Sequence, residues 1–390
     1  MSLSKLIKGG HVYAPEDMGI RDVLIVNDKI AAIGEDLIPA LPDTEVIDAA
    51  GKNVVPGFID GHIHFLGGGG GGGPATRSCI SHLSHYTRNG VTTAIGLLGI
   101  DRIGFTIEEL LIRAMALEEE GLSTYILDGS YHIPSTTITD SLSKDLYLID
   151  KVIGVKIAVR ASLSSHLTKD DIKKVVAEAW LGGRMGGKAG VVVSHIGSDP
   201  GIPLIEIADL MDEMGIPSER FVLTHVNTDE AILQESIQCG LRGIVMDLTG
   251  NWGTLDGKAV PQAKALKKLL EAGVNPKNIT MSSDAVAPFV HADRHLTVQP
   301  IGVCARAIHE MICEEKIDVP TAISVFTSNP ARVYHLKGKG VLQPGMDADV
   351  LLLDDAFTVD TTIAKGQVMV RNREVQKYGV IEQSIIDSLR

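Results

Sequence analysis

The chain has 390 residues, of which 44% are hydrophobic and 22% are charged, and its formal net charge is -13. This composition is typical of an enzyme-sized globular protein with a large core, and the negative charge argues against nucleic acid or an anionic membrane as a partner. The N-terminal residues lack the apolar core of a signal peptide, and no apolar run approaches the ~20 residues of a membrane span, so we expect a cytoplasmic protein.

Short strand-like runs alternate with turn residues near the N-terminus, as in DVLIVNDKIAAIG, and the same pattern returns over residues 341–380. Such alternation is typical of a small β-sheet. The two ends of the chain can therefore complete one β-domain together. We predict a β-sandwich in two parts, residues 1–55 and 339–390, around a central domain of residues 56–338.

The central domain alternates β-rich apolar runs with helical segments. Eight such runs are present, the number that a (β/α)8 TIM barrel requires: VVPGFIDGHIH, TTAIGLLG, STYILDGSY, VIGVKIAV, GVVVSHIG, FVLTHV, GIVMDLT and ITMSSD. Thr106 and Glu109 predict a helix start with a capping box, and Gly121 predicts its end. A second box is predicted at Thr168 and Asp171. An open doubly wound sheet would also alternate strand and helix, but its first strand would normally lead into a Gly-rich phosphate turn, where this chain has His-x-His.

Polar residues close several of these apolar runs. Barrel enzymes assemble their active sites at the carboxyl ends of the strands, so these side chains should converge. His62 and His64 lie two positions apart on the first strand and point the same way, which lets them bind one ion together. Any one histidine alone would more often be a hydrogen-bonded core residue, but the whole set predicts a metal centre: His62, His64, Lys156, His195, His225 and Asp284. The cysteines lack CxxC spacing and are expected to be reduced packing residues: Cys79, Cys239, Cys304 and Cys313.

Lys156 is the unusual member of this set, because an ammonium group cannot ligate a cation and an unpaired buried lysine is costly. A buried salt bridge is the alternative explanation. Desolvation, however, lowers the pKa of a lysine and leaves a free amine that can react with carbon dioxide. The resulting carbamate has two anionic oxygens that can bridge two ions, which suits this position.

With His-x-His on the first strand, lysine and histidines on the middle strands and aspartate on the eighth, the chain resembles the binuclear metal amidohydrolase superfamily over nearly its whole length. Within that superfamily it is similar to the isoaspartyl (β-aspartyl) dipeptidases in the segments PGFIDGHIHFLGGGG, GPATR, VTTAIGLLG, GSYHIPSTTIT, VIGVKIA, LTHVN and SSD. The resemblance implies a barrel flanked by a β-sandwich, two zinc ions per chain, a Lys156 carboxylated by carbon dioxide, a small-molecule substrate and a homo-oligomer. By the same resemblance, one ion is held by His62, His64 and Asp284 and the other by His195 and His225, with Lys156 bridging them.

The implied mechanism follows from two adjacent cations, which lower the pKa of a shared water so that a hydroxide attacks a carbonyl or phosphoryl centre near neutral pH. Asp284 takes the proton of that water and passes it to the leaving group. Tyr131, in GSYHIPS, resembles the family tyrosine that stabilises the carbonyl oxygen as charge develops on it. A buried core tyrosine is the alternative for this residue.

The chain departs from the dipeptidases at the positions where they pair with a charged substrate. Gly71 replaces the glutamate that binds the substrate's amino group, Leu163 replaces an arginine that binds a carboxylate, and Thr228 replaces a second arginine. Apolar side chains enter at further positions, such as Ile100, where the family has threonine. The predicted substrate pocket is therefore less polar than that of the family, and it consists of Gly69, Gly71, Ile100, Arg160, Leu163, Thr228, Trp252 and Val286.

Three functions stay open at this point. The first is a binuclear zinc hydrolase of altered specificity, toward a neutral ester, lactone or phosphotriester, arising either in a homologue or by redesign of the pocket. The second is a working isoaspartyl dipeptidase that hydrolyses β-aspartyl peptide bonds with other recognition residues, such as Arg160 or His291. The third is a non-catalytic scaffold, which would be expected to have lost metal ligands, whereas all six are present.

Overall fold

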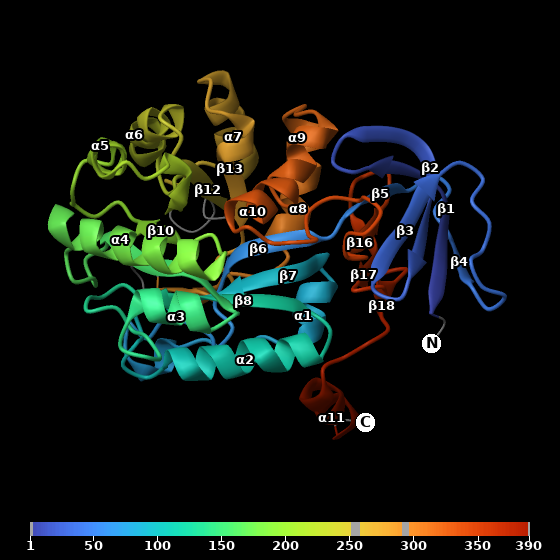
Figure 1. The fold of residues 1–390 in the computed structure, drawn as a ribbon, viewed down its shortest axis with the longest axis horizontal. Helices are drawn as coiled ribbons and strands as arrows, with labels where there is room; N and C mark the ends of the chain where they lie inside the picture. The colour runs from blue at the N-terminus through green and yellow to red at the C-terminus, as the bar shows by residue number, and fades with distance from the viewer. Residues whose placement is uncertain (1–2, 251–257, 291–295, 389–390) are drawn as a thin grey trace.

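The structure, a computed structural model, describes residues 3–250, 258–290 and 296–388 (Figure 1). At its centre, eight parallel strands form one sheet in the order β13-β12-β11-β10-β9-β8-β7-β6. These strands are β6 (Phe58–Ile63), β7 (Val91–Gly96), β8 (Ser123–Gly129), β9 (Val152–Arg160), β10 (Val191–Ile196), β11 (Phe221–Thr224), β12 (Val245–Thr249) and β13 (Ile279–Ser282).

The chain that follows β13 closes this sheet into a barrel by pairing with β6. The backbone N–H of Asp284 donates to the carbonyl of His62 at 3.0 Å, and the N–H of His64 donates to the carbonyl of Ala285 at 2.5 Å. The predicted (β/α)8 barrel is confirmed. The closure also brings the two ends of the barrel sheet together at the residues that were predicted to bind metal.

The barrel strands carry side chains that are buried on both faces, which explains why they read as continuous apolar runs rather than as alternating ones. Ile59, Leu127 and Val193 belong to a cluster of buried side chains inside the barrel. A larger cluster joins the outward-facing strand residues, such as Val155, to helix residues such as Ile172. The barrel interior is therefore a packed core.

Helices surround the barrel, and two of them begin where the sequence predicts (Figure 1). Helix α2 (Ile107–Glu119) has the Thr106–Glu109 capping box, and Gly121 follows its end at a φ of 112°. Helix α4 (Lys169–Gly186) has the second predicted box, between Thr168 and Asp171. The other helices are α1 (Leu83–Thr87), α3 (Leu142–Leu148), α5 (Ile205–Met214), α6 (Glu230–Leu241), α7 (Gln262–Glu271), α8 (Val303–His309), α9 (Val319–Ser324), α10 (Ser328–Val333) and α11 (Val380–Ser388).

Both ends of the chain build one nine-stranded sheet beside the barrel, as predicted (Figure 1). Strands β5 and β16 join the two ends, with Val54 opposite Leu352 in an antiparallel pair. The domain boundaries at residues 55/56 and 338/339 stay a prediction. The sheet contains β1 (Ser4–Tyr13), β2 (Asp17–Val26), β3 (Lys29–Gly34), β4 (Glu45–Asp48), β5 (Asn53–Pro56), β16 (Val350–Leu353), β17 (Val359–Ala364), β18 (Gln367–Arg371) and β19 (Glu374–Val375).

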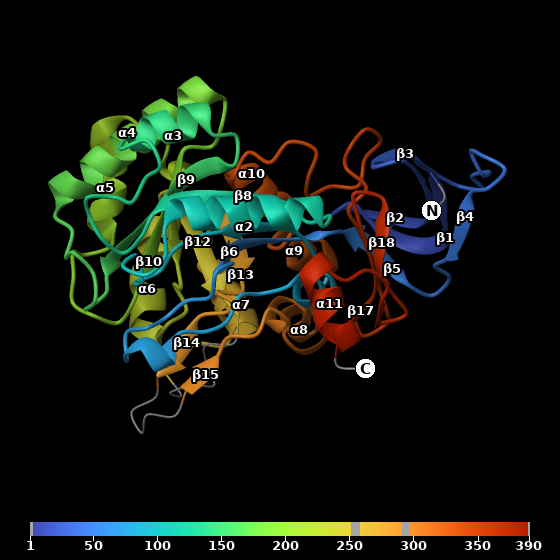
Figure 2. The same ribbon diagram turned by 90° about the horizontal axis from the view of Figure 1, so that it is seen from below.

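A short antiparallel pair, β14 (Pro288–Val290) and β15 (Leu296–Val298), lies at the edge of the barrel on the side away from the terminal sheet (Figure 2). Within the described ranges, no helix combines the length and the apolar character that crossing a bilayer would need. The four cysteines are free, as predicted, but Cys79 is exposed, so the packing role expected for it is wrong. It lies outside regular secondary structure, where no strand or helix buries it.

Candidate metal centre

Three predicted ligands meet at the seam where β6 joins the chain after β13. One ligand atom from each of His62, His64 and Asp284 lies within 4.8 Å of the other two, and all three side chains are buried. Oδ1 of Asp284 is 3.2 Å from Nε2 of His62 and 3.2 Å from Nε2 of His64. The pairing of β6 with the chain after β13 therefore delivers both histidines to one carboxylate.

The other three predicted residues adjoin this group from the middle strands. Nζ of Lys156, on β9, is fully buried and lies 3.3 Å from Nε2 of His62. The ring of His225 has its centroid 4.9 Å from that of His62 and 4.7 Å from that of His195. The structure thus brings all six together, although among the described residues only the first three meet as a group of metal-ligand atoms.

The protonation states expected here suit metal binding. Burial lowers the pKa of His62 to about 3, helped by the nearby Lys156, and burial also holds the pKa of His225 well below 6.5. Both imidazoles are therefore neutral, which is the form that ligates a metal. Burial lowers the pKa of Lys156 to about 7, which makes the free amine available near neutral pH.

The donor set also fits a divalent cation. Two imidazoles and a carboxylate are typical ligands of zinc. Nδ1 of His64 is buried and has no hydrogen-bond partner among the described residues, so its ring is not held by an alternative internal bond on that side. Asp284 and His225 adopt positive φ angles of 54° and 70°, conformations that are uncommon for residues other than glycine and that cluster at functional sites.

Two groups behind the histidines escaped the sequence analysis. Oγ1 of Thr224 lies 3.2 Å from Nδ1 of His62, and Oγ1 of Thr249 lies 2.5 Å from Nδ1 of His225. Thr224 in turn donates to Asp247, which is buried in β12. The signal that could have found Asp247 is its charge in the otherwise apolar run GIVMDLT.

Tyr131 lies next to two of the predicted metal residues, His195 and Lys156. Its hydroxyl is 2.5 Å from Nδ1 of His195, and Nζ of Lys156 lies 5.8 Å from the centre of its ring. Burial raises the pKa of Tyr131 well above 10, and the carboxylates of Asp284 and Asp101 raise it further. The hydroxyl therefore keeps its proton and can donate a hydrogen bond.

The glycine run lets the backbone pack directly against a predicted ligand. A Cβ atom built on Gly68 would lie 3.3 Å from Cγ of His64, and one built on Gly99 would lie 3.1 Å from Cε1 of the same ring. Gly69 has a φ of 89°, and a Cβ there would be only 2.1 Å from Cγ of Pro288. Larger residues at these positions would displace either the loop or the ring of His64.

Three of the residues that depart from the dipeptidase pattern meet at one point. A Cβ atom built on Gly71 would lie 2.9 Å from Cδ1 of Ile100 and 3.0 Å from Cδ1 of Leu163. These residues line a cavity of about 410 Å³, together with Gly69, Gly70, Pro74, Arg77, Asp101, Ile103, Gly104 and His132. None of the six predicted metal ligands is among the residues that line it. A side chain at position 71 would therefore touch the ends of two apolar side chains, of which Leu163 is 54% exposed.

Other residues predicted for the pocket lie elsewhere. The guanidinium group of Arg160 donates to both carboxylate oxygens of Glu235, at 2.8 and 2.7 Å, and to the carbonyl of Ile202. Arg160 was predicted to line the pocket, and this role stays a prediction; in the structure its guanidinium donors bind Glu235 and Ile202. The hydroxyl of Thr228 donates to the backbone carbonyl of His225 at 2.7 Å.

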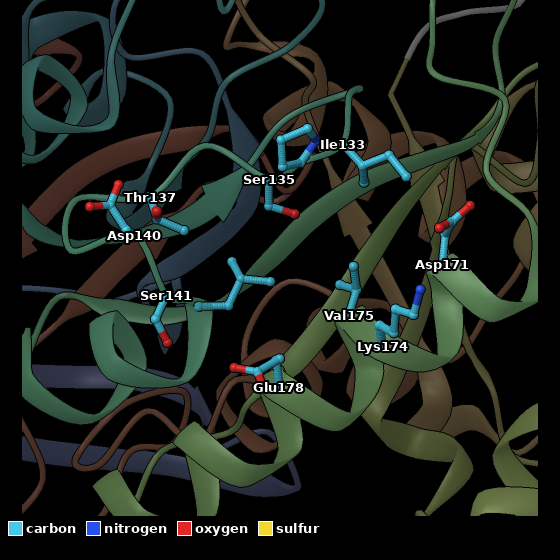
Figure 3. A pocket seen from close by; sticks show the side chains of 11 residues that line it. Ile133, Ser135, Thr137, Asp140, Ser141, Asp171, Lys174, Val175 and Glu178 are labelled. Atoms are coloured by element: carbon cyan, nitrogen blue, oxygen red, sulfur yellow. The ribbon is translucent and has the colours of Figure 1, made fainter.

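Val286, also predicted for the pocket, does not line this cavity. Val286 lines a different cavity of about 1030 Å³, together with Gln299 and residues of α8. Trp252 lies outside the described residues, as does His291. A further cavity of about 560 Å³ is bounded by Asp171, Lys174, Val175 and Glu178 of α4 and by the loop that follows Tyr131 (Figure 3). None of the six predicted metal ligands lines that third cavity.

Comparisons with known proteins identify relatives of this chain. Residues 238–376 match the amidohydrolase family. A solved β-aspartyl dipeptidase from the thermophilic keratin-degrading Fervidobacterium islandicum AW-1, in complex with a β-Asp-Leu dipeptide, is 34% identical. It superimposes with a TM-score of 0.88, and the match covers 96% of this chain and 99% of that chain.

More distant relatives have other activities. The adenine deaminase of Bacillus pumilus is 25% identical over 90% of this chain, which spans only 55% of the length of the deaminase. The enamidase of Eubacterium barkeri is 25% identical over 85% of this chain and 81% of its own length. Because the named relatives are enzymes and the His–His–Asp group is intact, the scaffold hypothesis is set aside. On the 34% identity across nearly all of the dipeptidase, the chain belongs to the amidohydrolase family and is a metal-dependent hydrolase.

Proposed function

We propose that this protein is a binuclear zinc hydrolase on the isoaspartyl dipeptidase framework, with a pocket that favours a substrate less polar than an isoaspartyl dipeptide. His62, His64 and Asp284 would hold one ion, His195 and His225 the second, and Lys156 would bridge them as a carbamate. The distances of 3.2 to 3.3 Å among His62, His64, Lys156 and Asp284 support this assignment. The resemblance to the dipeptidases supports zinc, the carbamate and a homo-oligomeric state.

When bound, the divalent ions would lower the pKa of a water molecule and polarise the bond to be cleaved. Asp284 would accept the proton of that water and deliver it to the leaving group, because its carboxylate lies at the centre of the ligand group. Tyr131 would donate its hydroxyl hydrogen to the oxygen on which negative charge develops. Nδ1 of His195, at 2.5 Å, holds that hydroxyl at the edge of the centre before a substrate arrives.

The contact among Gly71, Ile100 and Leu163 carries the specificity proposal. A glutamate at position 71, as in the dipeptidases, would have to displace Cδ1 of both apolar side chains, which lie 2.9 and 3.0 Å from its Cβ. The three differences therefore adjoin one another around position 71. A dipeptide's charged groups would lose partners worth ~1.5 to 3 kcal/mol each, whereas an apolar substrate would gain burial. We propose a neutral ester, lactone or phosphotriester as the substrate class.

Most aligned positions differ from the F. islandicum enzyme, which is 34% identical. A pocket redesigned on that enzyme would leave the rest of the sequence unchanged. The low overall identity therefore favours a divergent homologue.

A second candidate, a working isoaspartyl dipeptidase, is favoured by one observation in the same cavity. The guanidinium group of Arg77 stacks 4.1 Å from the ring centre of Phe105, and its Nη2 lies 3.5 Å from Oδ2 of Asp101. Neither oxygen of Asp101 accepts a hydrogen bond from a described residue. In a working dipeptidase, Arg77 and Asp101 rather than Arg160 would pair with the charged groups of the dipeptide.

One comparison tests the two candidates. The kcat/KM for β-Asp-Leu is measured against a panel of neutral esters, lactones and phosphotriesters at equal metal loading. We expect the panel to contain a better substrate and the dipeptide to fall ~10²-fold or more below the ~10⁴ M⁻¹s⁻¹ of an ordinary good enzyme.

Variants that restore the dipeptidase residues test whether positions 71, 100 and 163 cause the altered specificity. The triple variant Gly71→Glu/Ile100→Thr/Leu163→Arg should gain more activity on β-Asp-Leu than Gly71→Glu alone, because the single variant restores a partner for only one charged group of the dipeptide. Efficient dipeptide hydrolysis by the unmodified protein would refute the altered specificity, and its loss in Arg77→Gln would then identify Arg77 as the recognition residue.

A further inference from the structure

His62 is supported on its far side by a chain of buried hydrogen bonds. Nδ1 of His62 lies 3.2 Å from Oγ1 of Thr224, and the Thr224 hydroxyl donates to Oδ2 of Asp247 at 2.7 Å. Thr224 ends β11 and stands opposite Asp247 in the parallel pair of β11 with β12. All three side chains are at most 3% exposed. Solvent therefore offers these groups no alternative partners.

Two more hydroxyl groups define the orientation of Asp247. Thr280 donates to Oδ1 at 2.7 Å, and Ser282 donates to Oδ2 at 2.6 Å, both from β13. The carboxylate thus accepts from three hydroxyl groups. A carboxylate satisfied in this way cannot rotate without breaking several hydrogen bonds in a site where each unpaired polar group is costly.

The direction of the bond between His62 and Thr224 follows from counting protons. A threonine hydroxyl has one hydrogen to donate. With Asp247 as a carboxylate that accepts from three hydroxyl groups, Thr224 gives that hydrogen to Asp247, its oxygen accepts from His62, and Nδ1 of His62 is the protonated nitrogen. Oγ1 of Thr224 also lies 3.5 Å from Nδ1 of His225, but that nitrogen has a closer partner in Thr249.

The other nitrogen of His62 is then left with a lone pair. We infer that Asp247, acting through the Thr224 hydroxyl, is a positioning residue that fixes His62 as its Nδ1–H tautomer and presents Nε2 to the metal. Nε2 lies 3.2 Å from Oδ1 of Asp284. Nζ of Lys156, 3.3 Å from the same Nε2, is the donor that faces this lone pair in the metal-free protein. The role toward the metal rests on the proposed function, whereas the tautomer follows from the hydrogen bonds made to the Asp247 carboxylate.

The competing explanation is that Asp247 only ties β11, β12 and β13 together. Thr280 provides the matched control, because Thr280→Val removes one hydroxyl from the same carboxylate but leaves the chain to His62 intact. Thr224→Val breaks the chain of hydrogen bonds from Asp247 to His62 with little change of side-chain volume. Thr224→Ser keeps the hydroxyl and should behave as the unmodified protein does.

The experiment reads the tautomer and the metal affinity separately. In the metal-free full chain labelled with ¹⁵N-histidine, the His62 ring signals are assigned by their absence in His62→Gln. We expect Nδ1–H in the unmodified protein, in Thr280→Val and in Thr224→Ser, and its loss in Thr224→Val. The affinity for Zn²⁺, measured by competition with a chelating dye, should fall ~10- to 100-fold in Thr224→Val and stay within about 3-fold in Thr280→Val.

Several results would decide against the inference. An Nε2–H tautomer in the unmodified protein overturns it, whether or not the variants fold. Equal losses in Thr280→Val and Thr224→Val would show that Asp247 acts only as a tie between strands. If the unmodified protein shows the Nδ1–H tautomer but binds no Zn²⁺, the proposed function fails while the tautomer assignment holds.

Discussion

The buried carboxyl group of Asp128 should make this protein less stable as the pH rises. Asp128 lies near the end of β8, is fully buried, and neither of its oxygens accepts a hydrogen bond from a described residue. Its neighbour Asp145 accepts from the backbone N–H groups of Ile138 and Thr139 and from the Thr139 hydroxyl. Burial raises the pKa of Asp128 from 3.8 to about 9, and Asp145 raises it further.

The sign and size of the effect follow from proton linkage. Between pH 3.8 and about 9, folded Asp128 keeps a proton that the unfolded chain has released, so stability is greatest below this window and falls across it. The slope is about 1.4 kcal/mol per pH unit. From pH 4 to pH 8 the loss is on the order of 5 kcal/mol at most, because any water that reaches the group lowers its folded pKa.

Asp128→Asn should remove this dependence, because the amide stays neutral and can donate to Asp145 as the protonated acid does. The free energy of unfolding is measured by urea denaturation at pH 5, 6, 7 and 8 in chelator-treated protein, so that metal binding does not contribute. The difference between variant and unmodified protein should grow with pH in favour of the variant. Asp355→Asn, at an exposed aspartate, is the control and should keep the original slope. Parallel curves for Asp128→Asn and the unmodified protein would refute the reasoning.

The remaining predictions concern the metal centre. Elemental analysis should find two divalent ions per chain, and one ion or none in active protein would contradict a binuclear centre. Asp284→Asn should retain metal yet lower turnover ~10²-fold or more, since the general acid/base is lost. Unchanged turnover in this variant would contradict that role. Lys156→Ala should lose most activity and regain part of it with added short carboxylic acids, because their oxygens can take the place of the carbamate. An experimental map with metal bound and an unmodified Lys156 turned away from it would rule out the carbamate.

Much of the fold could be read from local patterns. Eight apolar runs predicted eight barrel strands because a strand buried on both faces has to be apolar throughout. The Thr106 and Thr168 caps were predictable because a capping box uses only residues within one helical turn. The six proposed metal residues were found because parallel strands end at the same edge of a barrel, which turns a position in the sequence into a position in space.

What the sequence could not supply was the partner of each side chain. Arg160, the last residue of β9, was predicted for the pocket as an alternative recognition residue, and its sequence position gave no sign that Glu235, 75 residues away, binds its guanidinium group. Gly71, Ile100 and Leu163 were noted one by one, whereas their mutual contact needs three separate loops to meet.

The sequence by itself thus determined the strands, the helix ends and the kind of ligands, since these depend on residues within a few positions of one another. The tertiary structure alone decided that Thr224 and Asp247 stand behind His62 and that Asp128 faces Asp145. The physical reason is that hydrogen bonds and pKa shifts act over a few ångströms of space. Only closure of the barrel, through the pairing of Asp284 and Ala285 with β6, brings residues more than 200 positions apart within that range.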